Sequence, residues 1–254
     1  MILTVDIGNS NIVIGGYQND ALTFITRFAT DRKMEADQYA LQLVGLLSLY
    51  KVNPAQIEGV ILSSVVPRLT HAVGDALGHV VNCTPLLLNR QNAQITVKTD
   101  NPDEVGADII ASAIALKGSY PLPAVIIDMG TATTLTALDA EGAVLGVSIY
   151  PGLYISLDAL TAGTSQLKGI ALEAPARAIG TNTADSMQSG MIFGTAAMLD
   201  GMIDRFAAEL GSVETIIATG GGAKQVIPHC RHKILFSDTM LLDGLYKTYK
   251  LMQQ

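Results

Sequence analysis

The residues best suited to chemistry lie in a turn near the start of the chain. Asp6 ends an apolar, β-rich stretch, and Gly8, Asn9, Ser10 and Asn11 follow it. Backbone N–H groups in a glycine-containing turn can bind phosphate oxygens. Asp6 would repel phosphate, so its useful role is to hold a hydrated Mg²⁺, which prefers oxygen ligands. The alternative is an ordinary tight turn in which Asn and Ser cap their own backbone.

A second turn repeats this pattern near the middle of the chain. Asp128 stands 122 residues after Asp6 (128 − 6), close to half of the 254-residue chain, and again ends an apolar run. Gly130, Thr131 and Thr133 follow it, and hydroxyl groups suit phosphate or a cation shell. This spacing favours duplication of a whole domain over a short repeat. Chance is the rival explanation, because buried strands that end in Asp-x-Gly are common.

A third acidic residue, Asp108, follows Val105, Gly106 and Ala107 and precedes Ile109. A desolvated carboxylate in such surroundings can have its pKa tuned. In a phosphoryl-transfer enzyme it would orient the acceptor hydroxyl and accept its proton. The structural alternative is a first-turn acid that the helix dipole stabilises.

Other motifs narrow the choice of chemistry. The sequence has no G-x-x-x-x-G-K-[ST] motif and no G-x-G-x-x-G that links a strand to a helix, which disfavours P-loop and Rossmann folds. Gly220–Gly222 follow a predicted strand, where the backbone could approach a flat ligand such as adenine or simply turn. The segment 229–232 (His-Cys-Arg-His) lacks a matching ligand pair, so we do not expect a metal site there. No serine stands in a G-x-S-x-G motif, so the sequence does not indicate the nucleophile of a serine-hydrolase triad.

Composition restricts the class of protein. Hydrophobic residues make up 49% of the chain and charged residues 15%, a balance typical of a well-packed α/β protein. The net charge of −7 disfavours nucleic acid as a partner. Two cysteines, no basic leader and no apolar run of about 20 residues predict a cytoplasmic protein that does not enter a membrane.

Strands and helices should alternate along the chain and position these turns. Apolar periodicity predicts strands or helices in the segments 2–5, 12–16, 35–50, 59–66, 103–116, 124–127, 135–138, 186–210, 215–219 and 241–254. The breaker cluster at 118–123 suggests two domains, 1–118 and 119–254.

In order and spacing, these motifs resemble those of the type III pantothenate kinases. The matching segments span nearly the whole chain and are 6–11 (DIGNSN), 63–67 (SSVVP), 101–108 (NPDEVGAD), 128–133 (DMGTAT), 151–152 (PG) and 179–183 (IGTNT). Each string is short, and their joint order carries the resemblance. It implies two tandem ribonuclease-H-like domains of the acetate-and-sugar-kinase/Hsp70/actin superfamily, with mixed sheets flanked by helices. It also implies ATP-dependent phosphorylation of pantothenate, the first step of coenzyme A synthesis, by a homodimer that needs Mg²⁺ and a monovalent cation, potassium or ammonium.

The resemblance also implies a role for each matching residue. Asp108 would be the catalytic base, Gly106 and Ala107 would border the pantothenate pocket, and Thr183 would reach the substrate from the partner subunit. Asp6 would bind Mg²⁺ through water, and Asp128 would bind the monovalent cation. ATP would contact Asp6, Gly8, Asn9, Ser10, Asn11, Gly130, Thr131, Ala132 and Thr133.

Three positions depart from the family pattern. Ile109 stands where the family usually has arginine, Thr99 where it tends to have tyrosine, and Val147 where it tends to have a second glycine. Ile109 and Thr99 fall in the expected acceptor pocket, so a kinase for another small hydroxyl compound and a non-catalytic regulatory homologue are the alternatives. If pantothenate is the acceptor, the replacement cation would be one of Arg68, Lys168 and Arg177.

Overall fold

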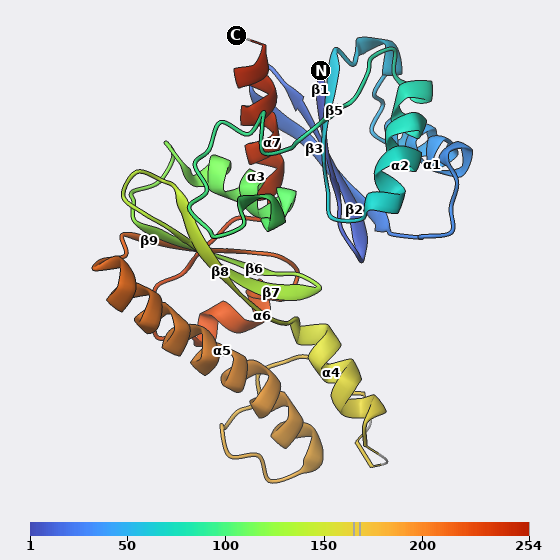
Figure 1. Cartoon of the computed structure of the whole chain (residues 1–254). Helices are drawn as coiled ribbons and strands as arrows, with labels where there is room; N and C mark the ends of the chain where they lie inside the picture. Colours follow the sequence, from blue (N-terminus) through green and yellow to red (C-terminus); the bar gives the residue numbers. More distant parts are fainter. Residues whose placement is uncertain (165, 168, 254) are drawn as a thin grey trace. The chain divides into compact units, whose positions relative to one another are not determined.

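The structure is a computed structural model that describes residues 1–164, 166–167 and 169–253, and it divides into two compact units (Figure 1). Unit 1 contains Met1–Ile95, Asp100–Ser119 and the chain from Thr239 onward. Unit 2 contains Thr96–Thr99 and Tyr120–Asp238. The sequence predicted domains 1–118 and 119–254. The chain crosses between the units after Ser119, and the segment from Thr239 onward, with the C-terminal helix, packs in unit 1.

Unit 1 is built on a five-stranded mixed sheet with the strand order β3-β2-β1-β4-β5. β1 pairs antiparallel with β2 and parallel with β4. The strands are β1 (Ile2–Ile7), β2 (Asn11–Gln18), β3 (Ala21–Ala29), β4 (Gly59–Ser64) and β5 (Leu86–Leu87).

Unit 2 repeats this topology strand for strand, in the order β8-β7-β6-β9-β10. β6 pairs antiparallel with β7 and parallel with β9, as β1 does with β2 and β4. Asp6 and Asp128 hold equivalent positions at the ends of β1 and β6, so the topology confirms the internal duplication. The strands are β6 (Ala124–Met129), β7 (Ala132–Leu138), β8 (Val144–Pro151), β9 (Thr215–Thr219) and β10 (Leu235–Phe236).

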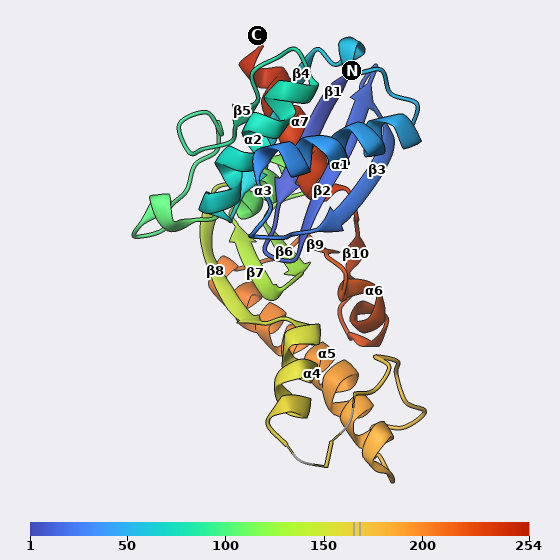
Figure 2. The same cartoon turned by 90° about the vertical axis from the view of Figure 1, so that its right-hand side faces the viewer.

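Helices cover both faces of the sheet of unit 1. One face carries α1 and α2, and the opposite face carries α3 and α7 (Figures 1 and 2). Their bounds are α1 (Ala36–Leu49), α2 (Pro67–Val80), α3 (Ala107–Leu116) and α7 (Met240–Met252), with 3₁₀ turns at Pro54–Gln56 and Pro102–Glu104.

Strand alternation decides which side chains of β1 face which helices. Leu3, Val5 and Ile7 belong to the core cluster formed with α1 and α2. Because successive side chains on a strand point to opposite faces, Thr4 and Asp6 lie on the face covered by α3 and α7. This alternation gives Asp6 the same face of the sheet as the helix that carries Asp108.

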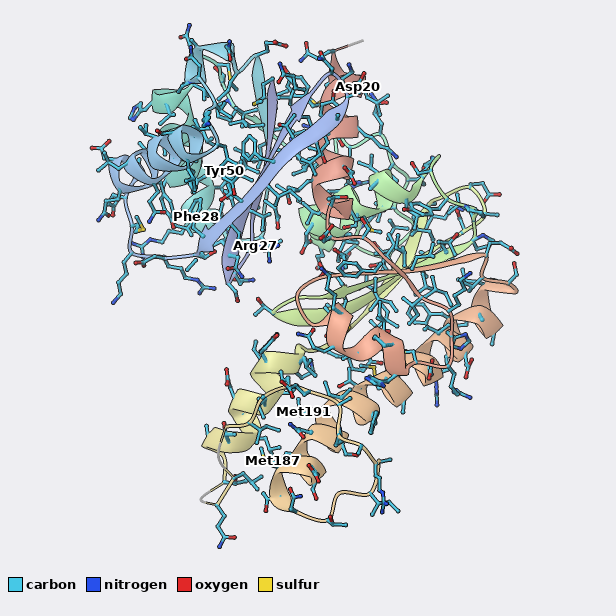
Figure 3. The ribbon with its side chains drawn as sticks, turned by 180° about the vertical axis from the view of Figure 1, so that it is seen from behind. Asp20, Arg27, Phe28, Tyr50, Met187 and Met191 are labelled. Atoms are coloured by element: carbon cyan, nitrogen blue, oxygen red, sulfur yellow. The ribbon has the colours of Figure 1, made fainter. Side chains whose placement is uncertain are left out.

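The second sheet packs against α5 (Thr183–Leu210), α4 (Leu153–Ala162) and α6 (Ala223–Val226), followed by a 3₁₀ turn at Ile227–His229. Met187 and Met191, one turn apart on α5, are among the buried side chains of this core (Figure 3). In the residues that the structure describes, no helix combines the length and the apolar character that crossing a lipid bilayer requires.

α3 and α7 approach each other so closely that only glycine fits at the crossing. An added Cβ on Gly244 would lie 1.8 Å from the carbonyl oxygen of Ala111. The stacked rings of Tyr17 and Tyr246, 4.3 Å apart, and the hydrogen bond from the Tyr17 hydroxyl to Asp243 Oδ1 (2.5 Å) join α7 to β2. α7 is therefore an integral part of unit 1, and it supports the helix that carries Asp108.

We expect Gly244→Ala to lower the free energy of unfolding by about 1–3 kcal/mol, because the added methyl group would force α3 and α7 apart. Gly74→Ala in α2 is the matched control, since an added Cβ there meets nothing within 4 Å and alanine favours a helix. Urea denaturation of both variants measures the difference. Equal midpoints would contradict the close crossing of α3 and α7.

Candidate active site

The turn between β1 and β2 is closed and anchored by backbone hydrogen bonds. The N–H of Gly8 donates to the carbonyl of Asn11 (3.0 Å). Thr30, which follows β3, donates from its hydroxyl to the Gly8 carbonyl (2.7 Å) and from its N–H to the Ser10 carbonyl (3.0 Å). These bonds fix the turn while Asn9, Ser10 and Asn11 remain exposed, as a phosphate-binding turn requires.

Arg32 also reaches this turn, and sequence reasoning missed it. Its Nη2 donates to Asn9 Oδ1 at 2.7 Å across a separation of 23 residues. Little in the sequence indicates that Arg32 lies near Asn9, because Arg32 follows β3, and the pairing of β3 with β2 was not predicted.

Asp6 lies at the carboxyl end of β1, where it pairs in register with Ser63 of β4. Asp6 is half-buried and Ser63 is fully buried. In-register side chains of neighbouring strands share one face of a sheet. A carboxylate and a hydroxyl therefore lie side by side on the face that α3 covers.

Asp108 stands in the first turn of α3, two residues after the N-cap residue Gly106. Its Oδ1 accepts a hydrogen bond from the N–H of Ile109 (2.8 Å). An added Cβ on Gly106 would lie 2.3 Å from that same oxygen, so the carboxylate occupies the space that a larger residue at 106 would fill. A larger residue at 106 would therefore force the Asp108 carboxylate to move.

Val65 connects this carboxylate to the end of β1. The N–H of Val65 donates to the carbonyl of Ile7 (3.1 Å), and a Cβ built on Gly106 lies 3.8 Å from Val65 Cγ1. Unit 1 therefore brings Asp6 and Asp108 to the same face and the same end of its sheet, although 101 residues separate them (108 − 6 − 1).

Burial raises the pKa of the Asp108 carboxyl above its ordinary value, while backbone hydrogen bonds, that of Ile109 first, act in the opposite direction. Desolvation penalises the charged form of an acid, and so it makes the carboxylate a stronger base. This is the environment expected of a group that accepts a proton during catalysis.

Glycines surround the equivalent turn of unit 2. Gly220, at φ +90°, would place a Cβ 2.7 Å from Asp128 Oδ1, and Gly130 would place one 3.5 Å from it. Gly152 donates from its N–H to the Thr131 carbonyl (3.1 Å), and its own Cβ would clash with that oxygen at 2.3 Å. Gly130 and Gly220 thus leave space beside the Asp128 carboxylate, and Gly152 allows its own backbone to approach the carbonyl groups of Gly130 and Thr131.

The threonines of this turn differ in exposure. Gly130 and Ala132 are exposed and Thr131 is half-buried, whereas Thr133 is only 1% exposed. Thr133 shares the face of Leu135, which belongs to the core with α5. Among the residues that the sequence assigned to the nucleotide, Thr133 therefore has its hydroxyl inside unit 2.

The donor atoms fit hard cations. The side chains of Asp6 and Ser63, and the carboxylate of Asp128, offer oxygen only, which suits Mg²⁺ and a monovalent cation. In the described part of the chain no three His, Cys, Asp or Glu residues could hold a metal together.

The segment around Cys230 is held by structural contacts. The buried carboxylate of Asp200 accepts hydrogen bonds from the N–H groups of Arg231 and His232 (2.8 and 3.1 Å). Burial, followed by the nearby Asp200, raises the pKa of the Cys230 thiol to about 12. The Cys230 thiol therefore loses its proton less readily than the thiol of an exposed cysteine.

A hollow of about 660 Å³ in unit 1 borders Ala107 at the start of α3. It also contains Arg90, whose Nη1 lies 2.9 Å from Asp103 Oδ1. Of the cations suggested as substitutes for the missing arginine, Arg68 and Arg177 are exposed and Lys168 lies outside the described residues.

The other two departures lie in unit 2. Thr99 has a buried hydroxyl oxygen with no hydrogen-bond partner among the described residues. Val147 lies in β8 opposite Thr136 of β7. Asp6 and Asp108 belong to unit 1.

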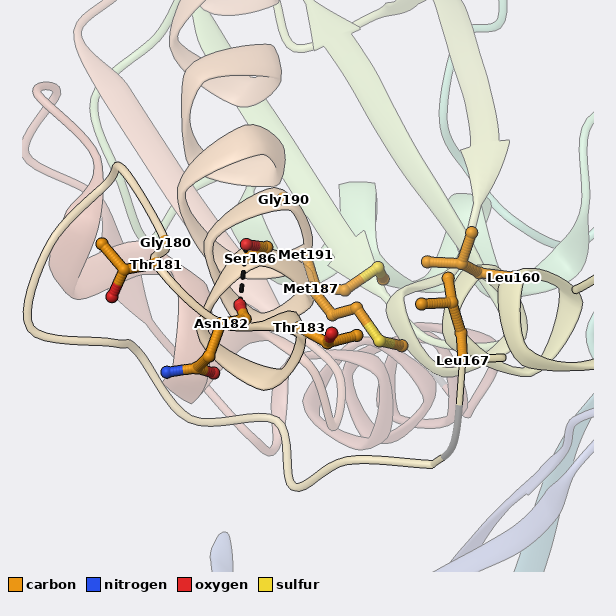
Figure 4. A pocket seen from close by; sticks show the side chains of 10 residues that line it. All are labelled: Leu160, Leu167, Gly180, Thr181, Asn182, Thr183, Ser186, Met187, Gly190 and Met191. Carbon is orange, nitrogen blue, oxygen red and sulfur yellow. Dashed lines mark hydrogen bonds between the residues drawn. The ribbon is translucent and has the colours of Figure 1, made fainter. Parts of the chain in front are cut away.

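Thr183 is the first residue of α5 and is exposed. It borders a groove of about 680 Å³ in unit 2, together with Asn182 and the apolar side chains of Leu160, Met187 and Met191 (Figure 4). Asn182 caps the helix by accepting a hydrogen bond from the N–H of Asp185 (2.9 Å). Thr183 and Asp108 therefore belong to different units of one chain.

Comparison with known proteins gives a consistent result. The family profile for type III pantothenate kinases matches residues 2–205. The type III pantothenate kinase of Roseiflexus castenholzii is 38% identical over 255 residues, which cover 100% of both chains. That of Thermomicrobium roseum is 37% identical over 255 residues, covering 100% of this chain and 98% of the relative.

Solved structures share the fold at low sequence identity. A protein of Campylobacter jejuni described as a Baf family transcriptional activator is 18% identical with a TM-score of 0.65, covering 99% of this chain and 98% of the other. MreB 5 of Spiroplasma citri, bound to AMPPNP, is 10% identical with a TM-score of 0.56, covering 99% and 96%. These likenesses confirm the predicted actin-like ATPase fold with two tandem α/β domains.

The raised pKa of Asp108 predicts how Asp108→Asn changes stability with pH. The folded wild type favours the protonated acid, so it loses stability as pH rises from the unfolded value of about 3.9 through the higher folded value. Asparagine does not titrate. The stability of the variant relative to wild type should therefore increase between pH 4 and pH 8, as measured by urea denaturation at each pH. A constant difference would contradict the burial of the charge.

Proposed function

The chain belongs to the type III pantothenate kinase family, and we propose that it transfers the terminal phosphoryl group of ATP to pantothenate, the first step of coenzyme A synthesis, giving 4′-phosphopantothenate. The observation that carries the residue assignment is the position of Asp6 and Asp108. Unit 1 holds a carboxylate suited to a metal and a desolvated carboxylate suited to a base on one face and at one end of a sheet.

Asp108 is the proposed catalytic base. Its partly buried carboxylate would accept the proton of the acceptor hydroxyl as the oxygen attacks the terminal phosphorus of ATP. Burial makes it more basic than an ordinary aspartate, and the N–H of Ile109 fixes its orientation. Gly106 leaves the space that the carboxylate needs.

The two turns are the proposed binding sites for Mg-ATP and its cations. Asp6 would hold hydrated Mg²⁺, with Gly8, Asn9, Ser10 and Asn11 donating to phosphate oxygens. In unit 2 the backbone of Gly130, Thr131, Ala132 and Thr133 would serve the same purpose, and Asp128 would hold potassium or ammonium. When bound, these cations supply positive charge that stabilises the transferring phosphoryl group.

The acceptor pocket is the part of the proposal that departs most from the family pattern. Ile109 cannot supply the charge-assisted hydrogen bond that arginine would give to a carboxylate, a loss of about tenfold to a hundredfold in affinity. Arg90, in the hollow beside Ala107, is a described cation near the start of α3. Its exposed ion pair with Asp103 is weak and would release it at little cost.

We also propose that the chain is a homodimer, because unit 2 exposes several large apolar side chains. Exposed apolar residues on β8, α4 and the segment before α5 are Ile149, Tyr154, Ile155, Leu160 and Ile179. Pairing of two subunits through these side chains would remove them from water, as expected of an interaction surface. Two-fold pairing of this kind would let Thr183 of each subunit complete the acceptor site of its partner.

The cytoplasm is the proposed compartment. Cys83 and Cys230 are both free thiols, which is typical of proteins in a reducing environment. ATP and 4′-phosphopantothenate, the proposed co-substrate and product, are consistent with the cytoplasm.

Asp108→Asn tests the chemistry. We expect turnover of pantothenate to fall by about 10²–10⁴-fold because the general base is lost, while ATP binding stays within a few-fold of wild type. Glu104→Gln, an exposed acid just before α3, is the matched control and should keep wild-type activity. An ATP-dependent phosphorylation assay with and without potassium, together with ATP titration calorimetry, gives both readouts. Full activity in Asp108→Asn would exclude this base, and turnover of other hydroxyl compounds but not of pantothenate would identify a different acceptor.

Ile155→Glu and Ile179→Glu test the dimer. We expect each charge to weaken self-association at least about tenfold and to lower activity in parallel, because Thr183 would no longer reach its partner's site. Leu41→Glu on α1 is the control, since Leu41 is equally apolar and 75% exposed but lies in unit 1. Light scattering across a dilution series measures the mass. A monomeric wild type with full activity would refute the shared site.

A further inference from the structure

We propose that Arg32 binds the terminal phosphates of ATP. This inference rests on the proposed nucleotide role of the β1–β2 turn, and it assigns a cation to that turn. The side chain of Arg32 contacts Asn9 directly, with Nη2 and Oδ1 2.7 Å apart.

The backbone holds Arg32 beside the turn. Thr30 is bound to the carbonyl groups of Gly8 and Ser10, at 2.7 and 3.0 Å, so the chain that leaves β3 runs along the turn. Arg32 comes two residues later. The N–H of Lys33 donates to Asp31 Oδ1 (2.9 Å), which closes a local turn and orients this stretch. The position of the guanidinium therefore follows from several bonds besides its own contact with Asn9.

The guanidinium has donors to spare. It carries five N–H groups, and in the part of the chain that the structure describes one of them is used, by Asn9. The Arg32 side chain is exposed, so its remaining N–H groups are accessible to a ligand beside the turn. A planar fork of this kind binds two phosphate oxygens at once, which an ammonium group does less well.

The negative charge of the chain favours a cation beside this turn. The chain has a net charge of −7, and Asp6 adds a carboxylate at the end of β1. The turn residues Gly8, Asn9, Ser10 and Asn11 carry no positive charge of their own. A polyphosphate would approach an acidic protein here, so a fixed cation beside the backbone donors offsets the repulsion and stabilises charge on the terminal phosphates.

The test compares Arg32→Ala, Arg32→Lys and Lys33→Ala in the full-length protein. Titration calorimetry with ATP and with AMP, each with Mg²⁺, reports binding without requiring turnover. We expect Arg32→Ala to weaken ATP binding about tenfold to a hundredfold and to leave AMP binding unchanged. Arg32→Lys should recover part of the loss. Lys33→Ala removes the same charge one residue away and should bind ATP like wild type.

Three results would overturn the assignment. Wild-type ATP affinity in Arg32→Ala would show that no phosphate contact is made. An equal loss for AMP would indicate a damaged turn, and an equal loss in Lys33→Ala would indicate a general effect of charge. If the wild-type protein binds ATP but does not phosphorylate pantothenate, the proposed acceptor is wrong, and the binding comparisons still test the role of Arg32. If the wild-type protein does not bind ATP, both the proposed function and the role of Arg32 are wrong.

Discussion

The alternation of side chains along β1 is the constraint on which the site of unit 1 depends. Leu3, Val5 and Ile7 are fully buried against α1 and α2, and a shift of one residue would turn all of them away from this core, toward the face of α3 and α7. This burial fixes the register of β1, and the register in turn assigns Asp6 to the face of α3. The hydrophobic core therefore decides where the proposed metal ligand lies, although it contributes no atom to the chemistry.

Close backbone approach is the second requirement, and it explains why glycine recurs at the sites. Gly106 makes room for the Asp108 carboxylate, Gly220 for that of Asp128, and Gly244 for the crossing that supports α3. Each glycine costs conformational entropy on folding. The fold accepts this cost where a side chain would displace a carboxylate or a supporting helix, and it places ordinary side chains elsewhere.

Local patterns in the sequence were sufficient to predict much of this arrangement. The apolar run of β1 and the polar turn after it are contiguous, as is the stripe of α1, so their own residues predict them. The pairing of β3 and the packing of α7 in unit 1 were not predicted, because they depend on partners far along the chain. The contact between Arg32 and Asn9 depends on that pairing, and the burial of Thr133 depends on which face of β7 meets α5.

The two units share a topology but have diverged in chemistry. Unit 1 keeps two carboxylates and an arginine around its turn, whereas unit 2 surrounds its single turn carboxylate with glycines and hydroxyl groups. Acidic groups suit proton transfer and a divalent ion, and a glycine-lined turn leaves its backbone groups accessible to anions or to a weakly held cation. Two strand ends are equivalent in topology, and the residues that follow each of them differ in charge and in size.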